Sequence, residues 1–278
     1  MNKKVLLTGS TGFVGRQVLK FLQNKKVEIV LVVRRGKKEI SNNKVVDIYT
    51  SDDIFSESIE WWADVCTGVD LIIHAAWYAE PGSYLYSDKN IECMQGTINM
   101  SRGAVISKVK RIVGIGTCFE YNLEKCRMLD VKVPLNPKTP YAASKVATYL
   151  LLSQYLLNCG VEFLWCRLFY LFGEGENDRR LIPYIESRLK NNLIVDLTSG
   201  EQIRDYMNVV DAGRMVVDMA YSKHVGPINI CSGVPITIRQ LSERIADNYG
   251  KGELLRFGAK GNNDFDPFCV VGVPFRKP

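Results

Sequence analysis

A tyrosine and a lysine in this chain have a spacing that suits acid–base chemistry. Tyr141 and Lys145 are four residues apart, so on a helix both side chains lie on one face. An ammonium group close to a phenol favours the phenolate and lowers the pKa of the phenol, which lets Tyr141 exchange a proton with an alcohol oxygen. Such pairs are common on helices. This one gains weight because it follows Asn136-Pro137-Lys138-Thr139-Pro140, an irregular segment that ends where a helix can begin.

A hydroxyl group stands at the end of a predicted strand just before that helix. Gly114-Ile115-Gly116-Thr117 closes an apolar run, and ligands of open α/β sheets bind at the carboxyl ends of the strands. Thr117 is therefore a candidate to hold a substrate oxygen.

A glycine-rich turn follows the first apolar run of the chain. The segment Val5-Leu6-Leu7-Thr8-Gly9-Ser10-Thr11-Gly12-Phe13-Val14-Gly15 combines a strand, a turn and a helix start. Gly9 permits the tight turn, Gly12 lets the backbone approach a pyrophosphate and Gly15 lets the helix pack closely. The free N–H groups of the helix terminus then face the anion. We predict that Gly9, Ser10, Thr11, Gly12, Phe13, Val14 and Gly15 bind a dinucleotide, the alternative being a turn without a ligand.

The end of the second strand indicates which dinucleotide. An acidic residue at this position selects a free ribose 2′-hydroxyl, whereas an arginine accommodates a 2′-phosphate. The strand Glu28 to Val33 runs into Arg34 and Arg35, with Lys37-Lys38 beyond, and no carboxylate stands at its tip. We therefore predict NADP(H), with Arg34 as the first choice for the phosphate and Arg35 as the second; the alternative is a solvated basic turn.

Asp53 follows the third predicted strand. Its carboxylate could accept a hydrogen bond from the adenine amino group, or it could simply lie at the surface beside Asp52.

The elements that must position these residues alternate between β-branched runs and helical patterns. This order predicts an α/β fold: a Rossmann-type, doubly wound parallel sheet with helices on both faces. Strands are expected at Lys4 to Thr8, Glu28 to Arg34, Lys44 to Tyr49, Asp70 to Ala75, Arg111 to Gly116 and Glu162 to Phe169, and helices at Phe13 to Asn24, Glu57 to Cys66, Tyr86 to Lys108 and Tyr141 to Asn158.

The regular alternation of strand and helix patterns ends after about residue 170, where a polar, glycine-bearing loop covers residues 173–178. We predict a cofactor-binding domain over residues 1–170 and a small mixed substrate lobe over 171–278, interleaved with returning elements of the first domain. Helices of this lobe are expected at Leu181 to Asn191, Val209 to Tyr221 and Thr237 to Tyr249. The tail Gly252 to Pro278 has no clean period and is expected to be a packed coil or partly mobile.

Composition excludes several classes of protein. The chain has 278 residues, 46% of them hydrophobic and 24% charged, which excludes collagen-like and disordered classes. The net charge of +6 is spread along the chain apart from the basic run at residues 34–38, so nucleic-acid binding is not indicated. No apolar stretch approaches the ~20 residues that cross a bilayer. The three apolar residues that follow Lys3-Lys4 are too few for the apolar core of a signal peptide.

The cysteines indicate a reducing compartment. Eight cysteines occur without a C-x-x-C pair and with only two histidines, so we expect no metal site. We interpret them as reduced, mostly buried thiols of a cytoplasmic protein.

These motifs together resemble an extended short-chain dehydrogenase/reductase of the NAD-dependent epimerase/dehydratase type, whose members act on nucleotide sugars. The resemblance covers roughly residues 3–250. It rests on the turn Thr8 to Gly15, on His74-Ala75-Ala76, on Thr117 four residues before Tyr121, on the pair Tyr141 and Lys145, and on Gly200-Glu201-Gln202-Ile203-Arg204-Asp205-Tyr206 with Asp211 beyond.

The resemblance implies roles for individual residues. Thr117, Tyr141 and Lys145 would form the catalytic triad, and Lys145 would also bond the nicotinamide ribose. Ala75 and Ala76 would lie on the cofactor side. Arg204 would contact the diphosphate of the sugar nucleotide, which suits a guanidinium fork; the alternative is an ion pair with Asp205 or Glu201.

Departures from the family pattern narrow the reaction. The dehydratases that this chain resembles carry an Asp-Glu pair directly after the active-site threonine, but here these positions hold Cys118 and Phe119, so dehydration is not expected. Reductases that also epimerise use a Cys/His couple. Cys118 is one residue out of register with that cysteine, and neither histidine lies in a suitable segment.

We therefore predict an NADPH-dependent oxidoreductase that reduces the 4-keto group of a nucleotide-linked 4-keto-6-deoxyhexose in deoxysugar and polysaccharide precursor biosynthesis. The alternatives are a redox-neutral nucleotide-sugar 4-epimerase and a non-catalytic cofactor-sensing protein. Besides Thr117 and Arg204, we expect Cys118, Phe119 and Tyr170 to contact the sugar, together with the loop Trp77 to Tyr84; these aromatic residues could equally belong to the core.

Two of the predicted helices carry a second apolar stripe. Family members commonly pair the helices that correspond to Tyr86 to Lys108 and Tyr141 to Asn158 into a four-helix bundle, which implies a homodimer. The alternative is burial beneath the C-terminal lobe. The stripe includes Leu150, Leu151, Leu152, Leu156 and Leu157.

Overall fold

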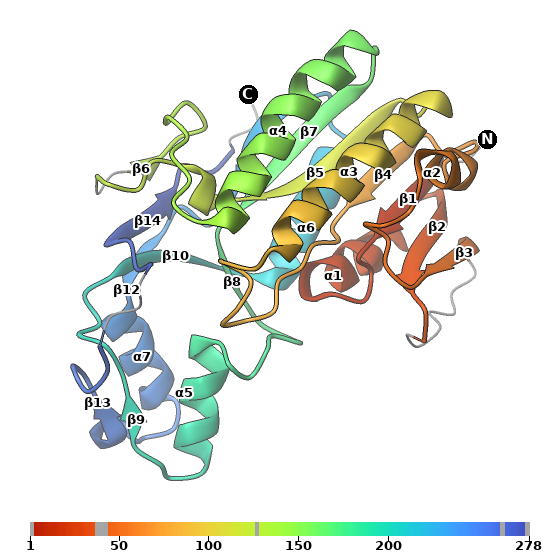
Figure 1. Cartoon of the computed structure of the whole chain (residues 1–278). Helices are drawn as coiled ribbons and strands as arrows, with labels where there is room; N and C mark the ends of the chain where they lie inside the picture. Colours follow the sequence, from red (N-terminus) through yellow and green to blue (C-terminus); the bar gives the residue numbers. More distant parts are fainter. Residues whose placement is uncertain (1–2, 37–43, 126–127, 262–264, 276–278) are drawn as a thin grey trace.

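The computed structural model describes residues 3–36, 44–125, 128–261 and 265–275. Within these residues the main sheet has seven strands in the order β11-β7-β5-β4-β1-β2-β3 (Figure 1). Every neighbouring pair in it is parallel. The strands are β1 (Lys3–Thr8), β2 (Val27–Arg34), β3 (Val45–Ser51), β4 (Leu71–His74), β5 (Arg111–Thr117), β7 (Glu162–Leu168) and β11 (Gly226–Ile230).

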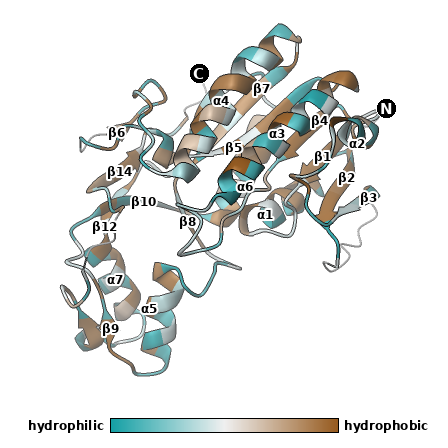
Figure 2. Cartoon of the chain, in the orientation of Figure 1, coloured by the Kyte–Doolittle hydropathy of each residue, from teal (hydrophilic) through white to brown (hydrophobic). Residues whose placement is uncertain are grey.

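Helices cover both faces of this sheet, as predicted for a doubly wound fold. The helices α1 (Phe13–Leu22) and α6 (Val209–Ala220) pack on one face. On the other face lie α2 (Ile59–Val65), α3 (Lys89–Ile106) and α4 (Pro140–Asn158). The central strands are apolar along their length because both of their sides are buried (Figure 2). The predicted α/β Rossmann-type fold class is confirmed.

One helix lies where we did not expect it. Helix α6 was predicted within the substrate lobe, but it packs against α1 on the main sheet. Gly213 makes this approach possible, since a Cβ atom there would lie 2.5 Å from the Cβ of Gln17. The chain then returns to the edge of the sheet as β11, beside β7.

The C-terminal lobe combines a mixed sheet with two helices. Its sheet has the order β12-β10-β14-β6, with β8 also paired to β10. The β10–β12 pair is antiparallel, and the other pairs are parallel. The elements are β6 (Met128–Leu129), β8 (Tyr170–Phe172), α5 (Leu181–Lys190), β9 (Val195–Asp196), β10 (Ile203–Asn208), β12 (Pro235–Thr237), α7 (Ile238–Asp247), β13 (Leu255–Arg256) and β14 (Cys269–Gly272), with short 3₁₀ helices η1 (Cys118–Glu120) and η2 (Gly252–Leu254).

The tail is not the coil that its irregular pattern predicted. Strand β13 pairs with β9, and all four residues of β14 are buried between β10 and β6. A four-residue apolar run is too short to show a period, so only its partners reveal it as a strand.

The described part of the chain contains no helix that is long and apolar enough to cross a membrane. In that same part, no three histidine, cysteine or carboxylate side chains group as metal ligands would. Seven cysteines lie in the described ranges, and only Cys159 among them is exposed.

Candidate active site

The glycine-rich turn has two positions, Gly9 and Gly15, at which a side chain would clash with neighbouring backbone atoms. Gly9 has a φ of +72°, and a Cβ atom on it would lie 2.6 Å from the backbone nitrogen of Ala76. A Cβ atom on Gly15 would lie 2.0 Å from the carbonyl oxygen of Gly9. The turn therefore packs directly on Ala75 and Ala76 at the end of β4, and α1 packs directly on the turn.

The turn also presents unsatisfied donors of the kind that bind an anion. Helix α1 begins at Gly12 without a side-chain cap and without an acidic residue in its first turn, which comprises Phe13, Val14 and Gly15. Ser10 is 1% exposed, and its hydroxyl has no hydrogen-bond partner in the described structure. Exposed Thr11 completes the turn. Buried polar groups and helix N-terminal amides require partners, so these residues fit the pyrophosphate of a dinucleotide.

The two arginines at the tip of β2 differ in their partners. Arg35 forms an exposed ion pair with Asp52, with 2.8 Å between Nε and Oδ1. Arg34 is exposed and has no ion-pair partner among the residues that the structure describes. The Asp53 carboxylate accepts a hydrogen bond from the backbone N–H of Phe55 at 3.0 Å. Lys37 and Lys38 lie outside the described residues.

Thr117 and Tyr141 come together at the carboxyl end of β5. Thr117 is the last residue of β5, and Tyr141 lies in the first turn of α4, which Thr139 caps by accepting a hydrogen bond from Ala142. Burial raises the pKa of Tyr141 above its ordinary value, and the neighbouring side chain of Thr117 opposes that rise. The predicted decrease in this pKa is wrong, because the structure buries the phenol more than it stabilises a phenolate.

Lys145 is buried close to this pair but makes a different contact. It is 3% exposed, and its ammonium group donates a hydrogen bond to the carbonyl oxygen of Ile115 at 2.6 Å. Burial lowers the pKa of Lys145 to about 7, although Cys93 and Glu120 oppose the shift. In this structure the lysine thus holds the backbone of β5 rather than the phenol.

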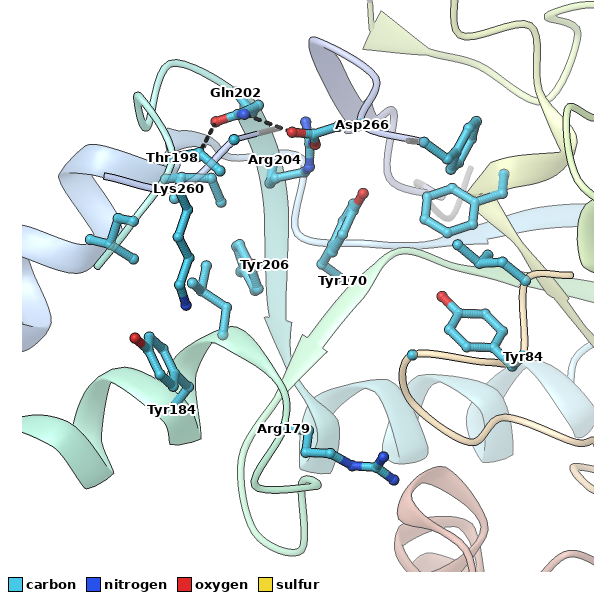
Figure 3. Close-up of a pocket in the computed structure, with 18 of the residues that line it drawn as sticks. Tyr84, Tyr170, Arg179, Tyr184, Thr198, Gln202, Arg204, Tyr206, Lys260 and Asp266 are labelled. Carbon is cyan, nitrogen blue, oxygen red and sulfur yellow. Dashed lines mark hydrogen bonds and ion pairs between the residues drawn. The ribbon is translucent and has the colours of Figure 1, made fainter. Parts of the chain in front are cut away.

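A cavity of about 770 Å³ lies between the main sheet and the C-terminal lobe (Figure 3). Tyr84 lines it and packs edge-on against Tyr141, with 4.9 Å between ring centroids. The cavity therefore adjoins the Thr117–Tyr141 pair. Its lining residues include Gly82, Tyr84, Phe119, Tyr170, Arg179, Tyr184, Asp196, Thr198, Gln202, Arg204, Tyr206, Lys260, Phe265 and Asp266.

Three of the predicted substrate contacts lie in different surroundings. Phe119 and Tyr170 both line the cavity, 6.0 Å apart between ring centroids. Cys118 is instead buried in an apolar cluster with Tyr121 and Phe169, and it is not among the lining residues. Burial raises the pKa of its thiol well above the ordinary value.

Arg204 lines the cavity, where its charge is balanced by a residue other than the predicted partners Asp205 and Glu201. Its Nη2 lies 2.5 Å from Oδ1 of Asp266, which comes from the C-terminal tail. Gln202 donates to the other carboxylate oxygen of Asp266 at 2.7 Å, as Figure 3 shows. Asp205, one of the predicted partners, instead accepts hydrogen bonds from Ser232 and from the backbone of Gly233 and Gly272.

This turn, hydroxyl pair and cavity can be compared with known proteins. The sequence pattern of the family described as "NAD dependent epimerase/dehydratase family" matches residues 5–231. The chain belongs to this family. Its members are nucleotide-sugar enzymes of the extended short-chain dehydrogenase/reductase type, so the predicted family is confirmed.

Several relatives of this epimerase/dehydratase family member span nearly its whole length. A dTDP-6-deoxy-L-talose 4-dehydrogenase (NAD(+)) from Aggregatibacter actinomycetemcomitans is 23% identical over 97% of this chain and 99% of its own. A GDP-6-deoxy-D-talose 4-dehydrogenase from the same organism is 22% identical over 88% of this chain and 79% of its own. The fold is similar to that of a UDP-N-acetylglucosamine 4-epimerase from Methanobrevibacter ruminantium, with a TM-score of 0.84, 21% identity and coverage of 98% and 90%.

The sequence did not predict a buried ion pair that lies beneath Thr117 in this family member. Glu120 and Arg167 are 0% and 1% exposed, and Oε2 lies 2.6 Å from Nε. Oε1 of Glu120 accepts a hydrogen bond from the backbone N–H of Thr117 at 2.8 Å, and Trp165 donates to both oxygens. Two features of the sequence could have revealed this ion pair. Arg167 is a charged residue inside the apolar strand β7, and Glu120 is a charged residue in the mainly apolar segment that follows β5.

His74 is a structural residue of the family's strand-end motif. Thr97 donates to the carbonyl oxygen of Cys93 at 2.7 Å and lies 3.0 Å from Nε2 of His74, so Nε2 is the protonated nitrogen. Nδ1 then accepts from Thr8 at 2.8 Å. Burial lowers the pKa of His74 to about 3. The neutral ring joins β1, β4 and α3 below the cofactor turn.

Proposed function

We propose that this enzyme reduces the 4-keto group of a nucleotide-linked 4-keto-6-deoxyhexose with NADPH, in the formation of deoxysugar precursors. The observation that carries the proposal is the pair of neighbouring hydroxyl side chains of Thr117 and Tyr141, which adjoins a large cavity through Tyr84. Two hydroxyl groups that converge on one point are suited to hold and protonate a carbonyl oxygen.

Tyr141 is the proton donor in this proposal. Because burial raises its pKa, the phenol stays protonated at neutral pH and can give its proton to the oxygen as negative charge develops there. Thr117 holds the same oxygen by a second hydrogen bond. When bound, the nicotinamide cofactor supplies the hydride for the carbonyl carbon. Lys145 bonds the cofactor ribose and stabilises the phenolate that remains.

The two residues after Thr117 support reduction rather than dehydration. Elimination of water needs a positioned acid and base. Cys118 is buried with its thiol pKa raised by burial, and Phe119 has no ionisable group. No acid–base couple directly follows Thr117, which supports a reaction that needs one proton donor rather than an elimination.

The cavity supports a nucleotide sugar as the substrate. Phe119 and Tyr170 present aromatic faces beside the hydroxyl pair, which suit the apolar face and the C5 methyl of a 6-deoxy sugar. Lys260 supplies positive charge for a diphosphate. Arg204 also lines the cavity, but a diphosphate would have to compete there with Asp266 for its guanidinium. Two 6-deoxytalose 4-dehydrogenases are among the relatives, and their printed names describe redox chemistry at the same carbon.

We assign the cofactor site to the turn from Gly9 to Gly15 with Ala75, Ala76 and Asp53. The choice of NADP(H) rests on Arg34, an exposed guanidinium without an ion-pair partner in the described ranges, with Arg35 as the second candidate. The name of the dTDP-6-deoxy-L-talose 4-dehydrogenase relative gives NAD(+) as its cofactor. A comparison of NADPH with NADH must therefore test the role of Arg34.

We also propose that the enzyme is a homodimer. Helices α3 and α4 lie side by side on one face (Figure 1). Residues 143, 147, 150, 154 and 157 of α4 are exposed and repeat at spacings of four and three. All but Gln154 are alanine or leucine, which is the pattern of a helix-bundle interface.

The test is turnover of 4-keto-6-deoxysugars that carry different nucleotides, followed by loss of reduced-nicotinamide absorbance. We expect stoichiometric NADPH consumption with one of them. Tyr141→Phe should lower kcat by about 100- to 10,000-fold, the range for loss of a general acid, and leave the dissociation constant of NADPH unchanged.

Two outcomes would contradict the proposal. Near-normal turnover by Tyr141→Phe would remove the tyrosine from the mechanism. Interconversion of two sugars without net cofactor consumption, seen by NMR, would instead identify a 4-epimerase.

A further inference from the structure

The ammonium group of Lys145 is buried without an anionic partner. Ile115 provides its one hydrogen-bond acceptor, and no ion pair to it occurs within the described residues. The titratable groups that act on it are Cys93 and Glu120, while His74 is lowered in pKa by the lysine itself. A buried cation with a single neutral acceptor is costly, so another feature of the site must stabilise it.

Trp77 lies directly against this ammonium group. The Nζ atom of Lys145 is 3.5 Å from the centroid of the Trp77 ring, whereas the ring of Trp165 is 5.8 Å away. The face of an indole attracts a cation through its quadrupole, and the attraction grows when water is excluded. The close contact of Trp77 therefore stabilises the charged lysine directly, whereas the carboxylate of Glu120 acts on it without an ion pair.

The indole is held in this orientation by a second buried side chain. Its Nε1–H donates to Oδ1 of Asn90 at 2.9 Å. Asn90 is 0% exposed, and its amide nitrogen donates to the carbonyl oxygens of Tyr84 at 2.6 Å and Ser87 at 2.9 Å. Because all of these atoms are engaged, the ring face is fixed toward Lys145.

The position of Trp77 in the chain places this contact at the cofactor edge of the sheet. Trp77 follows Ala76, whose backbone packs on Gly9 of the glycine-rich turn. Asn90 also fixes the backbone of Tyr84, whose ring packs on Tyr141. One loop thus supplies an aromatic contact to each member of the Tyr141 and Lys145 pair.

We propose that Trp77 is a positioning residue, which holds the ammonium group of Lys145 on its indole face and so keeps the charged lysine at the end of β5, where it can reach the ribose of a bound cofactor. This inference rests on the role given to Lys145 in the proposed function. A residue that merely filled space would be replaceable by any apolar side chain of similar size, and the experiment is designed around that difference.

The activity test compares two substitutions that differ in the aromatic face. Trp77→Leu keeps apolar bulk but removes the π-face, and we expect kcat to fall about 10- to 30-fold while the KM for the sugar changes less than about threefold. Trp77→Phe restores a ring and should recover most of that loss. Trp61→Leu, which removes a partly buried tryptophan of α2, is the matched control and should leave kcat unchanged.

A second readout uses the protein without cofactor or substrate. The pKa of Lys145 is about 7, while those of His74 and Cys93 are about 3 and about 11. Loss of the lysine charge should therefore change the fluorescence of Trp77 near pH 7. We expect this transition in the wild type, and its absence in Trp77→Phe and in Lys145→Met.

The outcomes separate this inference from the proposed function. If Tyr141→Phe and Lys145→Met remain active, the catalytic assignment fails. If both lose activity but Trp77→Leu performs like Trp77→Phe, or Lys145→Met leaves the pH dependence of the fluorescence unchanged, then the positioning role of Trp77 is wrong and the catalytic assignment stands.

Discussion

Burial moves the pKa values of three site residues toward their neutral forms. It raises the pKa of Tyr141, lowers that of Lys145 to about 7 and lowers that of His74 to about 3. Each shift has the same cause, since a low-dielectric environment disfavours the charged form of any group. The site at neutral pH thus contains a protonated phenol, a neutral imidazole and a lysine near its midpoint, so the phenol is in the form that can donate a proton.

At the scale of single residues, the preference of the enzyme for NADPH or NADH is expected to depend on the guanidinium of Arg34. Arg34→Asp replaces the proposed phosphate ligand by a carboxylate that repels phosphate and accepts from a ribose hydroxyl. We expect the ratio of kcat/KM for NADPH to that for NADH to fall by about 100-fold, which corresponds to the loss of one charge-assisted contact and the gain of a repulsion.

Arg35→Asp is the matched control for that ratio. The guanidinium of Arg35 is paired with Asp52, so its loss should change the ratio less than about fivefold. An unchanged ratio in Arg34→Asp would count against the assignment of the phosphate to this residue.

At the scale of elements, the end of β5 is the part of the fold that the active site depends on most. Thr117 must point its hydroxyl to Tyr141 while the strand turns into η1. Glu120 accepts the backbone N–H of Thr117 and pairs with Arg167 of β7. Arg167 in turn donates to the hydroxyl of Tyr121, which donates to Asn229 of β11. This buried network ties three neighbouring strands together where catalysis requires a rigid edge.

Breaking that network should lower the free energy of unfolding of the protein. Glu120→Gln leaves the Arg167 charge buried without its carboxylate, and such losses destabilise proteins by about 3–5 kcal/mol. We expect a decrease of this size in the free energy of unfolding, measured by urea denaturation.

Glu124→Gln is the control for that measurement, because it removes a carboxylate from an exposed ion pair with Lys138. It should cost less than about 1 kcal/mol. Equal effects of the two substitutions would show that the buried pair does not hold the end of β5.

At the scale of the whole molecule, the cavity exists because two lobes meet above the sheet edge. Strand β8 leaves the main domain and pairs with β10, so the lobe is continuous with the last strands of the sheet (Figure 1). An exposed ion pair between Arg179 and Glu80 joins the start of α5 to the loop after β4. The tail closes the far side of the cavity through Phe265 and Asp266. A substrate there touches both lobes at once.

The assembly of the molecule is testable on α4. Leu150 and Leu157 are 53% and 69% exposed in the single chain, which is unfavourable for leucine side chains in water. Substituting both by glutamate should convert a dimer into a monomer, as measured by light scattering during size-exclusion chromatography. Leu193→Glu, at a 45% exposed site after α5, should leave the mass unchanged. A monomeric wild-type protein at tens of micromolar would contradict the dimer.

Local patterns were sufficient for much of this protein. The strands and helices of the first half lie within a few residues of their predicted bounds, because their periodicity and caps are properties of neighbouring residues. The turn from Gly9 to Gly15 and the shared helical face of Tyr141 and Lys145 follow from spacing in the same way. These local features are the ones by which the chain resembles its family.

Only the tertiary structure decided the remaining features, and they all depend on residues far apart in the sequence. Arg204 pairs with Asp266, Lys145 lies on Trp77, α6 packs on α1 and β14 is buried between β10 and β6. The direction of the Tyr141 pKa shift belongs here too, since spacing placed a cation nearby but burial determined the sign. The amino-acid sequence by itself determined which side chains share a helix face or a turn. Which distant groups meet, and how much water remains around them, was decided by packing, because burial and long-range pairing arise only when the elements assemble.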